Sequence, residues 1–290
     1  MTCIELRNVS KTLDGRKVLD SISFAVSKGE VVAVSGIPET SAAQLMTIAS
    51  GYSNPDSGTV EVLKTLPGNY KSGGKSYSLW RIETFPPYLT PMRFIALCSK
   101  YYGFDISAGK RALREAGLWD LRNLKYEKLS AEEKRRFCMA PLLCANPKVV
   151  FVESLFPPDD REAGELFQKI LARLSSSETA FMICTDSLSR LRGVATRVIL
   201  LRDGAIASDA RMNDIVSARA GGGTRIRVSD VAAASAVVPE AKVERDCLVL
   251  GKGVTAIGPL ITKLENSGIT ILSVEKGNAW FPLDTEVPQR

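Results

Sequence analysis

An apolar run followed by a turn and an apolar-periodic segment most constrains how this chain can fold. Residues 29–58 read GEVVAVSGIPETSAAQLMTIASGYSNPDSG. The run Val31–Val34 leads to Gly36, a turn-rich segment follows, and a helical periodicity of apolar residues begins at Leu45. This order predicts a buried strand, a loop and a helix, which is the setting of a phosphate-binding loop.

The predicted loop lacks the residues that hold phosphate. A phosphate-binding loop reads G-x-x-x-x-G-K-[ST], because backbone N–H groups, a lysine and a hydroxyl together hold phosphate and magnesium. In the register that starts at Gly36, Ser41 replaces the second glycine, Ala42 the lysine and Ala43 the hydroxyl residue. Glu39 adds a negative charge inside the expected anion site. We expect a loop without bound nucleotide, and a nucleotide site with unusual residues is the alternative.

Composition is typical of a cytosolic globular protein. A chain of 290 residues is long enough for one large or two moderate domains. It has no apolar run of the roughly 18 to 20 residues that a membrane helix needs. The N-terminal residues show no basic segment followed by an apolar core, so we expect no secretory signal.

Histidine and cysteine usage excludes several kinds of site. The chain has no histidine, and its six cysteines form no C-x-x-C pair, so we expect no metal site and no histidine-dependent catalysis. The net charge of +6 is mild. The basic clusters Lys110–Arg114 and Lys134–Arg136 favour solvated helix faces, with attraction to anionic lipid headgroups as the alternative. We expect no nucleic-acid partner.

The remaining chain alternates between strand-like and helix-like patterns. Residues 1–28 predict strand, turn and strand, with Asp-Gly in the turn. Short, continuously apolar runs then alternate with amphipathic segments, which favours a parallel α/β sheet covered on both faces. The segment Leu66–Ser78 reads as a loop. Further strands are expected at 58–63, 149–152, 180–185 and 194–201, and helices at 91–119 (two segments), 129–143 with Ser130 as N-cap, and 161–174.

A glycine-rich stretch divides the chain into two domains. Residues 220–224, AGGGT, have the composition of a linker. We predict an α/β domain over 1–219 and a small α+β module over 225–290, because short strand-like and helix-like segments follow the linker.

The order of several framework segments resembles that of the ATP-binding-cassette (ABC) ATPase domain over residues 3–216. The likeness rests on the N-terminal sheet that leads to the phosphate loop, on SGYSNPDSGTVEV after the first helix, and on RVILLRDGAI. LSAEEKRRFCMAPLLCANPKVVFVES is similar to the family's signature helix and Walker B strand. The C-terminal module is similar to the accessory domain of multidrug, polysaccharide and motility-type exporter cassettes. The resemblance implies a P-loop NTPase-like cassette with a parallel sheet, flanking helices, an antiparallel N-terminal subsheet and a helical subdomain at about 91–143.

The resemblance places several of the family's nucleotide contacts on residues of the wrong chemistry. The aromatic residue that stacks on adenine corresponds to Leu13, and the Q-loop glutamine to Arg81. The signature L-S-G-G-Q keeps its serine, Ser130, but has Ala131 and Glu132 in place of its glycines. Glu132 would put a carboxylate where the family's backbone approaches the γ-phosphate.

The Walker B and switch positions are also changed. The resemblance places the Walker B aspartate at Glu153, the catalytic glutamate at Ser154 and the switch histidine at Asp186. Phosphoryl transfer depends on positioning and charge stabilisation, and removing one such group costs about 10²- to 10³-fold in rate. We therefore expect no catalytic residues, no ATP hydrolysis and very weak or absent ATP binding. ATP and magnesium would be cofactors only if the substituted site still binds them.

The resemblance implies a role in a membrane complex. We expect a non-catalytic subunit, peripheral on the inner face of the cell membrane, that contacts transmembrane subunits through Arg81–Phe94 and pairs with another cassette. One alternative is an atypical ATPase in which Glu153 holds the metal and Arg81 or a partner's residue contacts the phosphate. The other is a soluble regulator that kept only a protein-binding surface.

Overall fold

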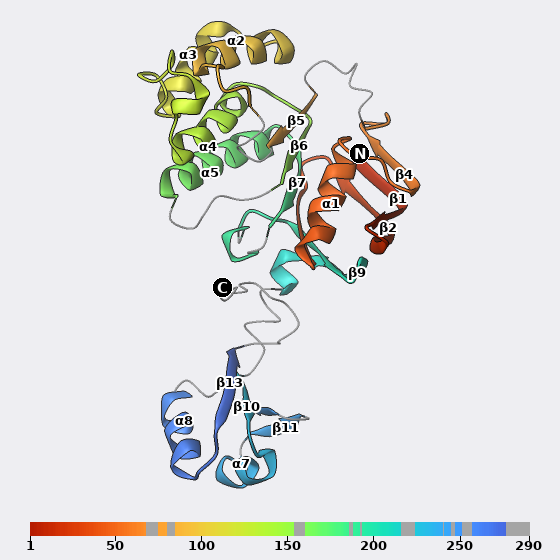
Figure 1. Ribbon diagram of the computed structural model, residues 1–290, viewed down its shortest axis with the longest axis vertical. Helices are drawn as coiled ribbons and strands as arrows, with labels where there is room; N and C mark the ends of the chain where they lie inside the picture. The colour runs from red at the N-terminus through yellow and green to blue at the C-terminus, as the bar shows by residue number, and fades with distance from the viewer. Residues whose placement is uncertain are drawn as a thin grey trace. The chain divides into compact units, whose positions relative to one another are not determined.

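The computed structural model divides the chain into two compact units, Met1–Asp209 and Ala210–Arg290 (Figure 1). Among the described residues no helix is long and apolar enough to cross a membrane. The structure describes residues 1–67, 75–79, 85–153, 160–185, 188–191, 193–215, 224–239, 241–244, 247–250 and 257–276.

The first unit begins with an antiparallel sheet of three strands, β1 (Thr2–Leu13), β2 (Arg16–Ser27) and β4 (Ser57–Val62), in the order β2-β1-β4. Asp14 and Gly15 connect β1 to β2, and both have positive φ. Two consecutive positive φ angles are what a tight two-residue hairpin needs, and Asp-Gly adopts them at low cost. The predicted strand–turn–strand unit and the antiparallel N-terminal subsheet are confirmed.

A second sheet of six strands holds the centre of this unit, in the order β5-β6-β7-β3-β8-β9. Strands β5, β6, β7, β3 and β8 pair in parallel. All four residues of β6 are buried, as continuous apolar runs predict for strands covered on both faces. The strands are β3 (Val31–Ile37), β5 (Ser76–Leu79), β6 (Val149–Val152), β7 (Ala180–Cys184), β8 (Arg197–Arg202) and β9 (Ala205–Arg211).

Two predictions from the sequence are wrong at this sheet. Ser76–Ser78 was expected in a loop but belongs to β5, whose four residues alternate between half-buried and buried positions. The serines of this edge strand interrupt any apolar run, so hydrophobic periodicity does not predict the strand. The first helix was expected from Leu45 but starts at Glu39. Its first turn is polar, which hides it from an apolar pattern.

Helix α1 (Glu39–Ala49) packs between the two sheets (Figure 1). One core cluster joins buried side chains of the antiparallel sheet, of α1 and of the parallel sheet, and it includes Ile4, Leu45 and Ile199. Burial of this kind is the main favourable term in folding. The helix therefore has a structural role that does not depend on any ligand at its first turn.

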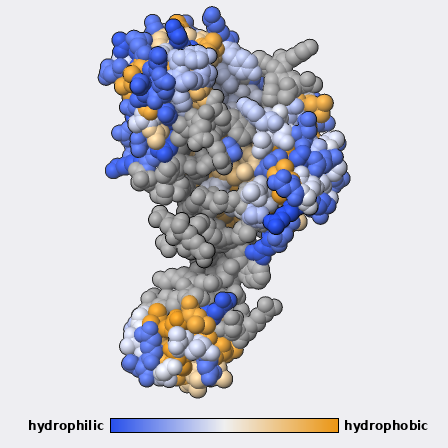
Figure 2. Space-filling view, in the orientation of Figure 1, coloured by the Kyte–Doolittle hydropathy of each residue, from blue (hydrophilic) through white to orange (hydrophobic). Residues whose placement is uncertain are grey.

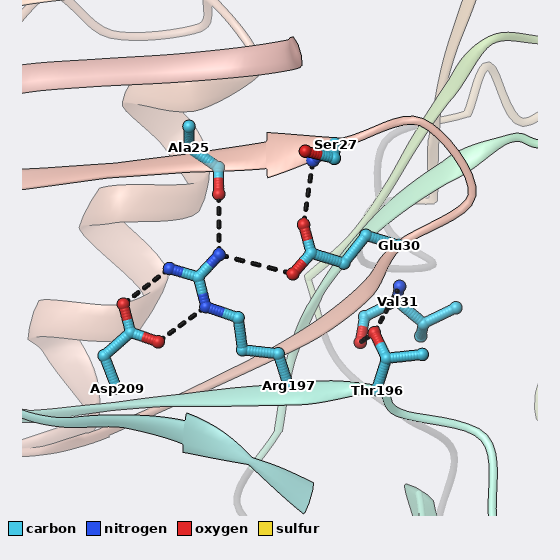
Figure 3. Close-up of polar contacts among 7 residues, drawn as sticks. All are labelled: Ala25, Ser27, Glu30, Val31, Thr196, Arg197 and Asp209. Carbon is cyan, nitrogen blue, oxygen red and sulfur yellow. Dashed lines mark hydrogen bonds and ion pairs between the residues drawn. The ribbon is translucent and has the colours of Figure 1, made fainter. Parts of the chain in front are cut away.

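Arg197 links the two sheets through polar contacts (Figure 3). Its guanidinium makes two bonds of 2.5 Å to the carboxylate of Asp209 on β9. Its Nη1 also donates to the carbonyl of Ala25 on β2, at 2.9 Å, and lies 3.3 Å from Glu30. These bonds raise the pKa of Arg197, with the Asp209 hydrogen bonds as the largest cause. Glu30 in turn accepts from the Ser27 backbone N–H at 2.8 Å.

Four aromatic side chains form the base of a helical subdomain. The ring of Phe137 lies 4.5 Å from that of Phe94, 5.0 Å from that of Tyr126 and 5.2 Å from that of Phe85, between centroids. The predicted helical region is confirmed, and Pro141 is the second residue of a 3₁₀ turn that follows α4. The helices of this unit after α1 are α2 (Pro91–Tyr102), α3 (Ile106–Glu115), α4 (Ala131–Met139) and α5 (Arg161–Ser176), with 3₁₀ turns at Tyr126–Lys128, Ala140–Leu143 and Leu188–Leu191.

The second unit is a β-α-β-β-α-β module with the sheet order β11-β12-β10-β13. This topology is that of the ferredoxin-like fold. Its own core includes Ile226, Leu248 and Leu264. Thr224, expected in the linker, is the first residue of β10, while residues 220–223 lie outside the described part of the chain. The elements are β10 (Thr224–Val228), α7 (Val231–Val237), β11 (Lys242–Glu244), β12 (Cys247–Leu250), α8 (Ile257–Asn266) and β13 (Ile271–Lys276).

Candidate functional site

The junction of β3 and α1 is where a phosphate-binding loop would lie. Strand β3 ends at Ile37 and helix α1 begins at Glu39, so Pro38 alone connects them. Pro38 is the N-cap and offers no side-chain capping bond. The backbone N–H of Ser41 donates to the Pro38 carbonyl at 3.0 Å, which closes the first turn. A segment that would have to wrap around a phosphate is therefore mostly helix.

Gly36 and Ala42 are in close contact. A Cβ at Gly36 would lie 3.2 Å from the Ala42 backbone N, 3.3 Å from the Ala42 Cβ and 3.4 Å from the Leu201 Cβ. Gly36 does not have a positive φ, so glycine serves close packing here and not a left-handed turn. Ala42 is 2% exposed and belongs to the core cluster. The position of the family's lysine thus faces the core in this chain.

The remaining residues of this segment do not fit Mg-ATP. Ser41 is fully buried, and its hydroxyl has no hydrogen-bond partner within the described parts of the chain. Ala43 is half-buried and carries no oxygen. A phosphate site needs a cation, and the metal needs an oxygen that can reach it. Neither is supplied by Ser41, Ala42 or Ala43, and the side chain of Glu39 lies outside what the structure describes.

The other predicted positions are spread over the unit. Leu13 is the last residue of β1, 37% exposed, and its aliphatic side chain offers no ring for stacking. Glu153 follows β6 and is half-buried, and its backbone N–H donates to the Leu79 carbonyl at 3.1 Å. Arg81, Ser154 and Asp186 lie outside the described residues.

Ser130 begins α4 with a complete capping box. Its hydroxyl accepts a hydrogen bond from the Glu133 N–H at 3.2 Å, and the Glu133 carboxylate accepts one from the Ser130 N–H at 2.7 Å. The Ser130 hydroxyl also donates to Glu132 at 2.9 Å. Hydrogen bonds from its own backbone N–H and from Ser130 lower the pKa of Glu132. The predicted helix cap is confirmed, and Ala131 occupies the first helical position.

A groove of about 660 Å³ opens between the end of α1, strand β5 and helix α2. Among the residues that the structure describes, its lining has no charged side chain, although 24% of the chain is charged. Leu97 is 59% exposed and Tyr101 49% exposed on its rim, and Tyr52 is exposed as well. The other lining residues are Ser50, Gly51, Ser76, Tyr77, Ser78, Phe85, Phe94, Cys98, Tyr102 and Cys138.

The polar atoms at the groove floor are satisfied or neutral. The hydroxyl of Tyr77 donates to the Cys138 carbonyl at 2.6 Å, and that of Tyr102 donates to the Ser76 carbonyl at 3.1 Å. Burial raises the pKa of Cys98 and of Cys138 to about 12, so both are neutral thiols at physiological pH. Such a groove suits an uncharged apolar group.

Sequence reasoning found only part of this groove. Phe85 and Phe94 lie in the predicted contact region, but Tyr52 and Ser76–Ser78 come from distant segments. Helix α2 did carry a signal, because residues at 94, 97, 98, 101 and 102 share one helical face and all are apolar or aromatic.

Comparison with known sequences shows that the chain is similar to ATP-binding proteins of ABC transporters. No protein-family model matches the chain. The spermidine/putrescine import ATP-binding protein PotA of Mycoplasma mycoides subsp. mycoides is 26% identical over 220 residues, which is 70% of this chain and 60% of that protein. The Nod factor export ATP-binding protein I of Rhizobium etli is 24% identical over 222 residues, with 74% and 70% covered. The lipoprotein-releasing system protein LolD of Wigglesworthia glossinidia brevipalpis is 24% identical over 204 residues, with 65% and 89% covered.

Comparison with solved structures gives the same fold. An ATP-binding subunit of an ABC transporter superposes with a TM-score of 0.65 at 16% identity, covering 74% of this chain and 92% of that one. A dimeric bacterial ABC transporter cassette superposes with a TM-score of 0.62 at 21% identity, with 72% and 98% covered. The predicted α/β cassette fold is confirmed. At these identities the structures speak for the fold alone, and the chain spans 60% of the length of PotA.

Proposed function

We propose that this chain, whose fold is that of an ABC transporter cassette and whose relatives are ABC transporter ATP-binding proteins, is a transporter subunit that has lost ATP hydrolysis. It would bind membrane subunits from their cytoplasmic side and pair with a cassette that hydrolyses ATP. Its ferredoxin-like unit would be an accessory domain. The observation that carries the proposal is the β3–α1 junction, where the phosphate loop is reduced to Pro38.

The burial of Ala42 supports loss of nucleotide binding. In a working site the lysine reaches the β- and γ-phosphates, whereas here the Cβ of that residue is buried in the core and lies close to Gly36. The acidic Glu132, whose carboxylate accepts from the Ser130 hydroxyl in the first turn of α4, would repel the phosphates of a nucleotide bound to a partner cassette. At an effective dielectric constant of about 20, two like charges 4 Å apart repel by about 4 kcal/mol.

The groove beside α2 supports the proposed membrane partner. It is open, uncharged and rimmed by the exposed apolar residues Leu97 and Tyr101. Contiguous exposed apolar surface marks interaction sites in proteins. The proposed contact region Arg81–Phe94 contributes Phe85 and Phe94 to this groove. A helix laid into it would bury the rim residues by the usual helix-in-groove mode.

Calorimetric titration of the purified chain with Mg-ATP tests the loss of binding. We expect no saturable heat up to millimolar nucleotide, and PotA of Mycoplasma mycoides, titrated in parallel, serves as the positive control. A micromolar dissociation constant would contradict the proposal and favour the atypical ATPase, whose hydrolysis would then be measured with its partner present.

A pair of matched variants tests the membrane partner. Leu97→Asp places a charge on the groove rim, and Leu66→Asp places one at a site of equal exposure outside the groove, 60% against 59%. We expect the tagged wild-type chain and Leu66→Asp to retain the transmembrane subunit from detergent-solubilised membranes, and Leu97→Asp to lose it. Equal retention by all three would place the contact elsewhere, and no transmembrane subunit with any of them would favour the soluble regulator.

A further inference from the structure

We propose that the basic face of α3 and the adjoining Trp119–Arg122 turn bind the anionic headgroups of a lipid bilayer. The interaction would act beside protein docking in the α2 groove and does not depend on it. The surface consists of Lys110, Arg111 and Arg114 on α3 and of Arg122 in the turn, and we call it the basic surface. The guanidiniums of Arg114 and Arg122 lie against the ring of Trp119.

The charge of the chain is concentrated in the helical subdomain. Residues 91–139 contain eleven Lys and Arg against six Asp and Glu, so they hold five of the chain's six net positive charges. Arg135 and Arg136 pair with Asp160 and Glu162 on or next to α5, which leaves nine cations against six acids, a net charge of +3, on the rest of this segment. Figure 2 shows a mainly hydrophilic surface over the part of the molecule that holds α2 and α3.

Helix α3 separates its cations from its apolar residues. Gly109, Ala112 and Leu113 are buried against the subdomain, while Lys110, Arg111 and Arg114 are exposed. Residues 110 and 114 are one turn apart and 111 and 114 are three apart, so the three cations share one face. Like charges held at this spacing destabilise an isolated helix. An anionic partner would relieve that repulsion.

The ring of Trp119 is in contact with two guanidiniums of the basic surface. The Cζ of Arg114 lies 4.0 Å from the centroid of the Trp119 ring and that of Arg122 lies 4.6 Å from it. Arg122 also donates to the Trp119 carbonyl at 2.8 Å, which fixes its position. Arg114 and Arg122 thus join α3 to the turn that follows it through the ring of Trp119, and the exposed Lys110 and Arg111 extend the cationic face along α3.

Nearby acidic groups neutralise this surface only in part. Glu115 lies 3.9 Å from Lys169. Asp105 accepts a hydrogen bond from the Ser107 N–H at the start of α3, and its pKa is lowered first by the Ser107 hydrogen bonds and also by the charge of Arg111. Asp120 is exposed beside Trp119 and offsets one of the four charges at most.

Apolar side chains that suit a membrane interface adjoin the basic surface. The carbonyl of Arg122 accepts from the Met92 N–H at 2.9 Å, and the Leu89 carbonyl accepts from the Tyr126 N–H at 2.7 Å. These bonds tie the turn to the segment that contains Tyr88, which is 64% exposed. Leu124, in the same turn, is 38% exposed. Tyrosine, leucine and clustered Lys/Arg are the side chains that interfacial protein surfaces combine.

The arrangement favours lipid over nucleic acid. Single-stranded nucleic acids bind where free aromatic faces alternate with cations, so that bases can stack. The Trp119 ring is already in contact with two guanidiniums, so it does not offer such a free face. Headgroups need only a cluster of cations, and about four to eight Lys or Arg are enough to bind an anionic leaflet.

Vesicle co-sedimentation of the full chain tests the proposal. The probes are phosphatidylcholine vesicles and vesicles of 70% phosphatidylcholine with 30% phosphatidylglycerol, at 100 mM salt. The test variant is Lys110→Gln/Arg111→Gln/Arg114→Gln. The matched control is Arg7→Gln/Arg16→Gln/Lys64→Gln, which removes the same net charge from exposed positions in or next to the N-terminal sheet.

We expect the wild-type chain to bind the phosphatidylglycerol vesicles and to lose binding as salt rises. One basic residue near the surface strengthens binding about fivefold, so the test variant should lose about 100-fold and the control much less. Equal binding to both vesicle types, or equal loss in both variants, would overturn the proposal. Tighter binding of a 20-nucleotide single strand than of vesicles, abolished by the test variant, would assign the surface to nucleic acid instead.

Discussion

At the scale of single residues, Arg197 is a structural link between the two sheets. It connects β8 to β9 through Asp209 and to β2 through the Ala25 carbonyl, with its side chain 26% exposed. Arg197→Met keeps the length of the side chain but leaves Asp209 without its bidentate partner. We expect the free energy of unfolding to fall by about 1–3 kcal/mol, because hydrogen bonds to charged groups contribute that much when partly buried. Urea denaturation of the full chain measures it.

Arg7→Met is the matched control for this prediction. Arg7 pairs with Glu5 at the surface, where its own side chain is 62% exposed. Exposed ion pairs of this kind contribute about 0–1 kcal/mol. An equal loss of stability in the two variants would mean that the Arg197 contacts do not join the sheets energetically.

Ala42 allows a second test at the residue scale. Ala42→Lys restores the residue type of a phosphate-binding loop, yet position 42 lies close to Gly36 and is 2% exposed in the core. We expect the variant to unfold at a markedly lower temperature and to gain no affinity for Mg-ATP, because a buried ammonium and an overpacked helix each cost several kcal/mol. Thermal denaturation with and without nucleotide measures both effects.

Gln44→Lys is the control on the same helix, at a half-buried position. It should fold with nearly unchanged stability. If Ala42→Lys were stable and were stabilised further by Mg-ATP, the β3–α1 junction would have to open in solution into a loop that binds phosphate.

At the scale of elements, variants at the start of α4 can distinguish a helix cap from a phosphate contact. Ser130→Ala removes the hydroxyl that accepts from the Glu133 N–H. We expect the free energy of unfolding to fall by about 1 kcal/mol, the usual contribution of a serine N-cap. Ser130→Asp keeps an acceptor at the cap and should restore most of the loss. Chemical denaturation of the three proteins gives the comparison.

The same variants measure function if the chain is paired with an active cassette. If Ser130 acts only as a helix cap, we expect the pair to have the same ATPase activity with serine and with aspartate at position 130. A drop in activity with Ser130→Asp, without a drop in stability, would instead assign Ser130 to a phosphate contact across the interface.

Elements with a strong hydrophobic period could be predicted, and short or polar ones could not. Strand β6 was placed to the residue, since four buried positions in a row give an unambiguous apolar run. Strand β5 was missed because Ser76 and Ser78 carry no such signal, and its pairing with β6 is set by tertiary contacts. The predicted start of α1 is wrong because the residues of its first turn are polar. The absence of a lysine and a hydroxyl at Ala42 and Ala43, by contrast, can be read directly from the sequence.

The groove could be predicted only in part, since its lining joins four separate stretches of chain, 50–52, 76–78, 85–102 and Cys138. The aromatic face of α2 can be recognised from its helical period. The sequence around Tyr52 and Tyr77, however, carries no pattern that predicts that they line the same groove as Phe94. Contacts of this kind depend on how β5 docks beside β6. The ferredoxin-like topology was likewise out of reach, because strand order is not encoded in the period of any one strand.

At the scale of the whole molecule, two separate cores predict two stable fragments. The unit 1–209 and the unit 210–290 each bury their own apolar residues. The segment between β9 and β10 contains Arg219 followed by Ala-Gly-Gly-Gly, a composition typical of a linker that includes a site for trypsin. We expect brief trypsin treatment to cut first at Arg219 and to give two fragments that both keep cooperative thermal unfolding.

Arg219→Gln should slow that cut without changing the unfolding temperature of the intact chain. First cuts within α2–α4, or an N-terminal fragment that no longer unfolds cooperatively, would mean that the second unit is needed to complete the first, and the accessory role proposed for it would have to be replaced by a structural one.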